Sequence, residues 1–245
     1  MAQFLSRPLN WLFLALGALV AAMTAFVVFQ PVQVIPRLAY GPEYELIDQN
    51  GQPFTDRDFQ GRIVLYGFGY TSDPTDIIIQ TLTDMQDFQR RIKAEEFDTQ
   101  VALALILFDN QRDTPERRQA FAGEHGLDLS NWVLLSGDAQ SLKRVIGQGF
   151  GVYYEAVPLA DLLESRSEWL REDVSVEVTP DAYGFLQAQR YILVDERNII
   201  RAEYRAPLDV ELAMRDIRYI IREKNSKGVS RALNEAAHLF LCYPQ

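Results

Sequence analysis

The sequence is poor in cysteine, histidine and positive charge. It contains one cysteine, Cys242, and two histidines. A single cysteine excludes an internal disulfide, a CxxC redox pair and a zinc site built from several cysteines. The 24 lysines and arginines are outnumbered by 34 acidic residues, which gives a formal charge of −10. A nucleic-acid partner is therefore disfavoured, because its phosphates would be repelled.

Common catalytic motifs are also missing. The sequence has no Gly-rich phosphate loop, no nucleophile elbow, no HExxH and no credible Ser-His-Asp set. His125 lies in the segment Glu124-His125-Gly126, which is typical of a helix C-terminus ended by glycine. We therefore predict that the chain is not an enzyme and that it carries no cofactor.

The sequence does contain a long apolar run near its start. Residues 11–29 carry no charge and as a helix would span roughly 28 Å, close to the thickness of a bilayer core. They predict a transmembrane helix between a tail at 1–10 and a linker at 30–42. A cleaved signal peptide is the alternative, although its apolar core is usually shorter. The excess of acidic residues lies in the part of the chain that follows this apolar segment. We therefore expect a single-pass inner or plasma membrane protein with its globular domain on the periplasmic side.

The remaining chain alternates between strand and helix patterns. Apolar or alternating runs predict strands at 44–48, 63–70, 101–108, 132–135, 191–195 and 199–204. Helical spacing and capping signals predict helices at 75–94, 115–124, 139–146 and 208–223. This order favours one α/β domain over 43–224, with a mixed sheet covered by helices on both faces.

Two segments lie outside this alternating pattern. Residues 155–185 are rich in acidic side chains and form either a solvated insertion or a docking face for a partner. Residues 225–245 predict an amphipathic C-terminal tail with Val229, Leu233 and Phe240 on one stripe. This tail either packs on its own domain or binds a partner protein or the membrane interface. Cys242 in the tail is interpreted as a small buried apolar residue.

Three motifs are specific in their combination. They are Gly67-Phe68-Gly69-Tyr70-Thr71 followed by Pro74, Arg112-Asp113-Thr114-Pro115-Glu116, and Phe150-Gly151-Val152-Tyr153-Tyr154. In this order they resemble the Sco/SenC family of thioredoxin-fold proteins, membrane-anchored factors associated with copper delivery to cytochrome oxidase. The resemblance spans about 43–223 and implies a thioredoxin-like mixed sheet.

The residues that bind copper in that family are not present in this chain. The family pattern places two cysteines after the first motif and one distant histidine, and soft sulfur ligands suit Cu(I). Aligned on the motifs, Asp73 and Ile77 stand at the cysteine positions and Gln187 at the histidine position. We predict no metal site there. Asp73 and Asp76 could offer oxygens to a hard cation, but capping of the following helix is the simpler interpretation.

The resemblance and the missing ligands together support a function in electron transfer without catalysis. The first hypothesis is a membrane-anchored accessory or structural subunit of a respiratory or photosynthetic complex, such as alternative complex III or a terminal oxidase. Its partners are the membrane and the other subunits. The alternative is a Sco-like assembly factor for the copper centre of cytochrome c oxidase. A third hypothesis is an activity without thiols in the cleft around Tyr70, Asp73 and Gln187, although a thioredoxin fold without a thiol lacks its usual nucleophile.

Overall fold

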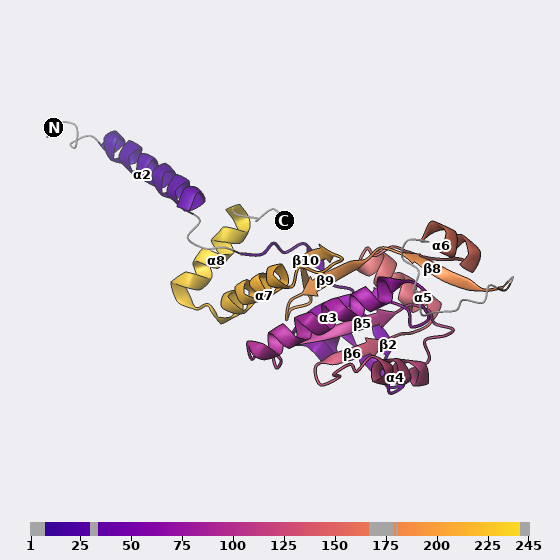
Figure 1. The fold of residues 1–245 in the computed structure, drawn as a ribbon. Helices are drawn as coiled ribbons and strands as arrows, with labels where there is room; N and C mark the ends of the chain where they lie inside the picture. Colours follow the sequence, from indigo (N-terminus) through magenta and orange to yellow (C-terminus); the bar gives the residue numbers. More distant parts are fainter. Residues whose placement is uncertain (1–7, 30–33, 167–178, 180, 241–245) are drawn as a thin grey trace. The chain divides into compact units, whose positions relative to one another are not determined.

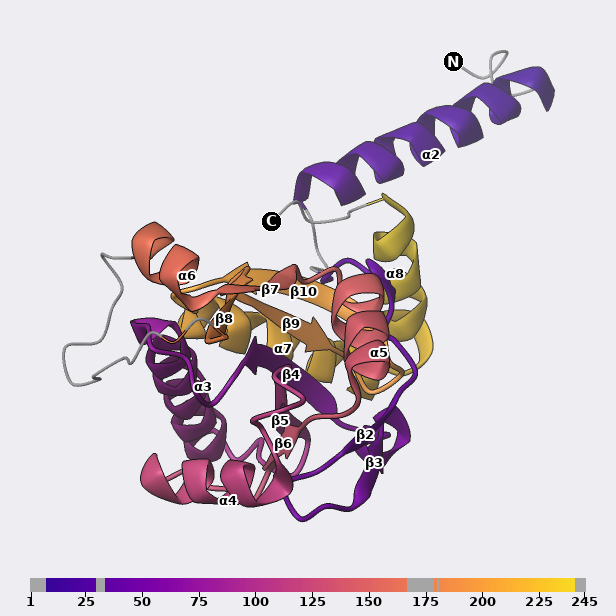
Figure 2. The ribbon, with the colours of Figure 1, turned by 90° about the vertical axis from the view of Figure 1, so that its right-hand side faces the viewer.

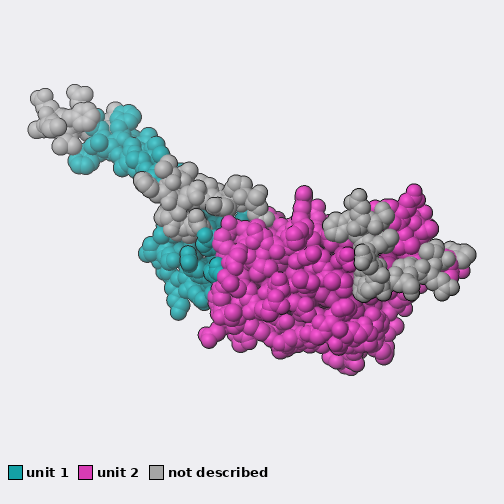
Figure 3. Space-filling model, viewed as in Figure 1, with its two compact units in different colours: residues 1–36, 218–245 teal, residues 37–217 magenta. Residues whose placement is uncertain are grey.

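The computed structural model describes residues 8–29, 34–166, 179 and 181–240 of the 245-residue chain. It divides into two compact units, shown in different colours in Figure 3. The larger unit comprises residues 37–217, and the smaller comprises residues 1–36 and 218–245. Every strand among the described residues belongs to the larger unit.

A mixed six-stranded sheet forms the centre of the larger unit (Figures 1 and 2). Its order is β1-β10-β9-β4-β5-β6. The strands are β1 Ala39–Tyr40, β4 Ile63–Gly69, β5 Val101–Leu107, β6 Trp132–Leu135, β9 Arg190–Val194 and β10 Ile199–Arg205. Strands β4, β5 and β6 are parallel, whereas β9 runs antiparallel to both β4 and β10. This arrangement confirms the predicted mixed sheet, and the apolar runs at 63–70 and 101–108 are its buried central strands.

Helices cover both faces of this sheet. They are α3 Asp76–Ala94, α4 Pro115–Glu124, α5 Ala139–Leu142 and the first half of α7 Val210–Asn225, of which residues 210–217 belong to the larger unit. On one face, Tyr66 and Phe68 join a buried cluster with Leu142 of α5. On the other, Gly67 leaves room for α3, since a Cβ at this position would lie 2.6 Å from the Met85 sulfur. Large residues at this position of β4 would therefore push α3 away from the sheet.

Two small sheets flank the central one. Strands β2 Glu45–Ile47 and β3 Pro53–Thr55 pair antiparallel ahead of a 3-10 turn, η1 Asp56–Phe59. Gly51 follows Asn50 and takes a φ of 75° in the turn between β2 and β3, a conformation that glycine adopts readily in hairpin turns. The second small sheet pairs β7 Tyr154–Pro158 with β8 Tyr183–Gln187, with α6 Leu159–Ser165 between them. It overlaps the acidic insertion predicted at 155–185 and extends past it by one residue at the start and two at the end. Residues 167–178 and 180 of this insertion are outside the described residues.

Several boundaries differ from the sequence prediction, and three of these differences are larger changes of structure or have a visible cause. The predicted linker at 30–42 contributes strand β1, because Ala39 and Tyr40 pair with β10, a long-range contact that a two-residue pattern cannot signal. The helix predicted to end at 146 continues as a π-helix, η2 Lys143–Gly149. The helix predicted from 208 begins at Val210, because the Asp209 carboxylate accepts from Leu212 N at 2.9 Å and caps its first turn.

The smaller unit contains helices α2 Pro8–Phe29 and α8 Gly228–Phe240, together with residues 218–225 of α7. Helix α2 includes the apolar run at 11–29 and starts three residues before it. Among the described residues, no helix combines the length and hydropathy expected of a membrane span. Helix α8 lies within the segment predicted as an amphipathic C-terminal tail, and His238 near its end lies 2.9 Å from a Glu223 carboxylate oxygen. Cys242 lies outside the described residues.

Candidate functional site

The candidate site lies where the parallel strands β4 and β5 end. Loops that follow parallel strands meet at one edge of a sheet, the usual place for a site in an α/β fold. The loop after β4 carries Tyr70 to Thr75, and the loop after β5 carries Asp109 to Thr114. The first and second sequence motifs are therefore neighbours in space, as the 3.0 Å hydrogen bond from Phe108 N to Gly69 O shows at the strand ends.

Asp73 and Gln187, two of the positions aligned with the family's copper ligands, are in direct contact. Gln187 is the last residue of β8 and donates from Nε2 to the Asp73 carboxylate at 3.2 Å. The other carboxylate oxygen accepts from the backbone N and the hydroxyl of Thr75 at 2.9 and 2.6 Å. Asp73 and Gln187 are 4% and 5% exposed. Three donors thus surround a carboxylate that water barely reaches.

Ile77, the third aligned position, lies in the first turn of α3 and is buried. Its backbone N donates to the Thr75 hydroxyl at 3.3 Å, so Thr75 is the N-cap of α3. The interpretation of Asp73 as a helix cap is therefore wrong in detail. Thr75 occupies the capping position, and Asp73 instead holds Thr75 in place.

Burial raises the pKa of Asp73 to about 6. The hydrogen bonds from Thr75 oppose this effect, and the Tyr70 hydroxyl and the Arg166 guanidinium add smaller opposing contributions. Burial and the nearby Asp73 carboxylate also raise the pKa of Tyr70, which stays protonated. The Tyr70 hydroxyl accepts from Phe185 N at 3.3 Å, so it links the loop after β4 to β8.

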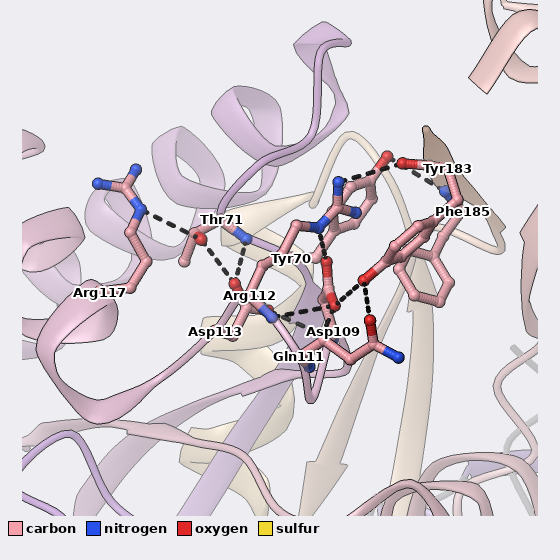
Figure 4. A network of polar contacts seen from close by, with 9 residues as sticks. All are labelled: Tyr70, Thr71, Asp109, Gln111, Arg112, Asp113, Arg117, Tyr183 and Phe185. Carbon is pink, nitrogen blue, oxygen red and sulfur yellow. Dashed lines mark hydrogen bonds and ion pairs between the residues drawn. The ribbon is translucent and has the colours of Figure 1, made fainter. Parts of the chain in front are cut away.

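A second polar network lies beside the first and is drawn in Figure 4. The Asp113 carboxylate accepts from the backbone N and hydroxyl of Thr71 at 3.0 and 2.5 Å. The Thr71 hydroxyl also accepts from Arg117 Nε at 3.3 Å. Burial raises the pKa of Asp113 to about 6, while the bonds from Thr71 act against that shift. Asp113 therefore ties the second motif to the first.

Asp109 and Tyr183 complete the network and were not predicted from the sequence. Asp109 is 1% exposed, forms an ion pair with Arg112 and accepts from the Tyr183 hydroxyl at 2.9 Å. The Arg112 guanidinium lies 4.0 Å from the centre of the Tyr183 ring, within the range of a cation–π contact. The available signal was the position of Asp109 directly after the apolar β5 run. Tyr183 gave no signal, because it lies 74 residues after Asp109 and no local sequence pattern links the two.

A groove of about 760 Å³ opens next to this network. Its walls come from the loop after β5, from α5 and η2, and from β7 and β8. Aromatic side chains dominate it, and Phe108 stacks on Tyr154 with ring centres 4.7 Å apart. Tyr153 is 55% exposed at the groove. The third sequence motif, 150–154, thus contributes to this groove rather than to the Asp73 cluster.

The donor set around Asp73 does not fit copper. Cu(I) prefers thiolate and imidazole ligands, whereas these positions offer a carboxylate, a carboxamide and an aliphatic side chain. His125 lies at the end of α4 and His238 is in the smaller unit. In the described part of the chain, no group of three His, Cys, Asp or Glu residues could hold a metal ion. The proposed oxygen site of Asp73 and Asp76 also lacks support, since the Asp73 oxygens already accept from Thr75 and Gln187.

Comparison with known proteins gives consistent matches. The SCO1/SenC family model matches residues 33–220. A putative copper-binding protein of Stutzerimonas stutzeri is 33% identical over 114 residues, which are 46% of this chain and 53% of that protein. The mitochondrial SCO1 homolog of Mus musculus is 29% identical over 163 residues, which cover 62% of this chain and 56% of that protein. The chain therefore spans about half the length of the curated relatives it matches.

Solved structures share the fold. A SCO1/SenC family lipoprotein from Bacillus anthracis superposes with a TM-score of 0.62 at 19% identity, covering 77% of this chain and 99% of that one. ScoI of Bradyrhizobium japonicum with copper bound gives a TM-score of 0.57 at 24% identity, covering 74% of this chain and 99% of that one. At these identities the likeness establishes the thioredoxin-like fold alone.

Proposed function

This chain belongs to the SCO1/SenC family, and from that membership we propose that it acts in the assembly of a cytochrome oxidase without binding copper itself. Such a protein would be non-enzymatic and would hold another assembly protein or an oxidase subunit. The observation that carries this proposal is the Asp73–Gln187 contact at the positions aligned with the family's metal ligands.

The relatives support assembly over the first hypothesis of a permanent subunit. One similar structure is described as BsSco, a member of the Sco family of cytochrome c oxidase assembly proteins, with a TM-score of 0.55. Fold analogy alone does not carry a function across. Family membership supports a role connected with cytochrome oxidase, and the residues around Asp73 support a role in which this chain does not bind the copper.

A structural subunit of a respiratory or photosynthetic electron-transfer complex remains the second candidate. The observation that favours it is the exposed apolar side of α8, where Val229 and Leu233 are 77% and 39% exposed. An apolar helix face in water is a common mark of a protein interface. A permanent subunit would cover this face in the assembled complex.

The proposed location is a membrane, with the globular domain on the periplasmic side. Helix α2 supports this proposal because its 22 residues carry no charged side chain. Trp11, Leu12 and Phe13 are each more than half exposed on it. Such a surface would be stable in a lipid environment and costly in water.

Two measurements test the function. The purified full-length protein is loaded anaerobically with Cu(I) and desalted, and we expect far less than one copper per chain. In cells lacking the protein, we expect the oxidase to lose copper and activity, and wild-type protein or an exposed-site control, Asp76→Asn, to restore both. Stoichiometric copper on the purified chain would overturn the copper-free role, and an unchanged oxidase would overturn the assembly role.

Co-purification separates the two candidates. Native protein is extracted in mild detergent, separated by size and analysed with its companions by mass spectrometry. An assembly factor is expected with oxidase precursors and absent from the mature enzyme. Constant stoichiometry in a mature complex that contains heme or iron-sulfur subunits would instead favour the structural subunit.

A further inference from the structure

The outer edge of β7 has backbone groups that β8 does not use. Antiparallel strands alternate between residue pairs that exchange backbone hydrogen bonds and pairs that do not. Ala188 N donates to Tyr153 O, and Leu159 N donates to Ala182 O, both at 2.9 Å. The two bonds join residues 153 with 188 and 159 with 182, which continue the β7–β8 register at its two ends. They therefore show which residue pairs of the two strands exchange hydrogen bonds and which do not.

It follows that Glu155 and Val157 bond to β8, whereas Tyr154 and Ala156 direct their N–H and C=O groups away from it. Phe185 lies opposite Ala156 and supports this assignment, because its N–H donates to the Tyr70 hydroxyl and not to β7. Within the described residues, no other hydrogen bond to the backbone of Tyr154 or Ala156 is found. Ala156 is exposed, so this edge faces solvent.

The same edge lies along the aromatic groove. Tyr154, Glu155 and Ala156 line the groove of about 760 Å³ together with Phe108 and Tyr183. A polypeptide strand is the ligand that matches a row of unpaired N–H and C=O groups, and apolar side chains on alternate positions fill pockets beside such an edge. The shape and the hydrogen-bonding groups therefore suit an extended peptide.

Charge identifies the kind of peptide. Glu155 is exposed beside the edge and accepts from the hydroxyl of Tyr153, the residue just before β7. Asp109, the other groove carboxylate, already pairs with Arg112. Lys143 on the opposite wall is the basic residue among the groove-lining side chains. The chain's net charge of −10 adds long-range attraction for a positive partner.

We propose that the free edge of β7 binds an extended segment of a partner protein in which apolar and basic residues alternate. The segment pairs with the backbone of Tyr154 and Ala156, places its apolar side chains in the aromatic groove and its basic side chains near Glu155. This inference is independent of the copper question, because none of these residues belongs to the Asp73 cluster.

The test uses a fluorescently labelled nonapeptide in which valine and lysine alternate, titrated with the full-length protein in detergent. Ala156→Pro removes the outward N–H without breaking a hydrogen bond to β8, since proline is tolerated on a strand edge that does not donate to its neighbour. We expect this variant to bind at least about tenfold more weakly, which corresponds to about 1.4 kcal/mol. Glu155→Gln should weaken binding severalfold and reduce its dependence on salt. Glu164→Gln on α6 is the matched control and should bind as the wild type does.

The peptide provides an independent control that does not depend on folding of a variant. N-methylation of alternate residues blocks backbone pairing and should abolish binding to the wild-type protein. Equal binding of the methylated peptide, or of a peptide with glutamate in place of lysine, would overturn the proposal. So would a dissociation constant above about 1 mM. A wild-type dimer that Ala156→Pro converts to a monomer would show that a second copy of the chain, and not a partner protein, occupies the edge.

Discussion

At the scale of single residues, the Asp73 carboxyl group makes stability depend on pH. Burial raises its pKa to about 6 in the folded chain, whereas an unfolded aspartate titrates near about 4. Between these values the folded state holds a proton that the unfolded state has lost. The free energy of unfolding therefore falls as pH rises through this window, by about 3 kcal/mol in total for a pKa that differs by about 2 between the folded and unfolded chain.

Asp73→Asn removes this titration. We expect the stability of the variant relative to wild type to rise by up to about 3 kcal/mol between about pH 4 and pH 7. Urea unfolding at several pH values measures the difference, and Asp113→Asn should behave in the same way because the pKa of Asp113 is also raised to about 6. The exposed Asp76→Asn is the control. A relative stability of Asp73→Asn that does not change with pH would show that Asp73 titrates normally.

A second prediction concerns the three positions aligned with the family's ligands. If they occupy the geometry of the copper site, Asp73→Cys combined with Ile77→Cys and Gln187→His should create a Cu(I) site with about one copper per chain. Anaerobic titration followed by desalting measures the stoichiometry. The matched control carries Asp73→Cys, Ile78→Cys and Gln187→His and keeps Ile77. Ile78 is buried as Ile77 is. Equal copper binding by both variants would contradict the alignment.

The residues of the site differ in how far the sequence could reveal them. Asp73 and Gln187 were found together because the motifs fix their positions relative to strands, and the structure places them in contact. The bond between Asp109 and Tyr183 could not be found in this way. It depends on how the β7–β8 insertion folds over the loop after β5, and no local pattern encodes that packing.

At the scale of elements, Asp84 connects α3 to two other parts of the fold. Its Oδ2 atom accepts from the Tyr191 hydroxyl of β9 at 2.7 Å and from Leu208 N at 2.8 Å. The side chain is 6% exposed. Asp84→Ala leaves these buried donors without their acceptor, and each such loss costs about 1–3 kcal/mol. We expect the free energy of unfolding to fall by about 2–4 kcal/mol, measured in urea.

Asp87→Ala on the same helix is the control for Asp84→Ala. Asp87 pairs with Arg90 at the surface, and such pairs contribute less than about 1 kcal/mol. Similar effects of both substitutions would show that the buried hydrogen bonds of Asp84 contribute no more to stability than a surface ion pair does.

Most elements were predictable because their signals are local. The N-cap Thr114 with Pro115 at the first turn fixes the start of α4, and the uninterrupted apolar run of β5 marks a central strand. Strand β1 has no such signal. Its two residues are extended because β10 offers them an edge, so its existence depends on a chain segment about 160 residues away in the sequence.

At the scale of the whole molecule, two helices carry apolar surface that could attach the chain to a membrane. Helix α2 has an uncharged apolar surface, and α8 exposes Val229 and Leu233. The family match begins at residue 33, just after α2, so removal of residues 1–32 leaves the matched domain intact. This boundary allows the contribution of α2 to be measured separately.

We expect the full-length chain to stay with membranes after an alkaline carbonate wash and the chain lacking residues 1–32 to appear in the supernatant. Burial of an uncharged helix in lipid is far more favourable than surface binding by one amphipathic helix, which an alkaline wash disrupts. Fractionation followed by immunoblotting measures the distribution. The matched control is the full-length double variant Val229→Ser and Leu233→Ser, which should remain in the pellet. If the shortened chain stays in the pellet and the serine variant is released, attachment depends on α8, and the anchor proposed for α2 is wrong.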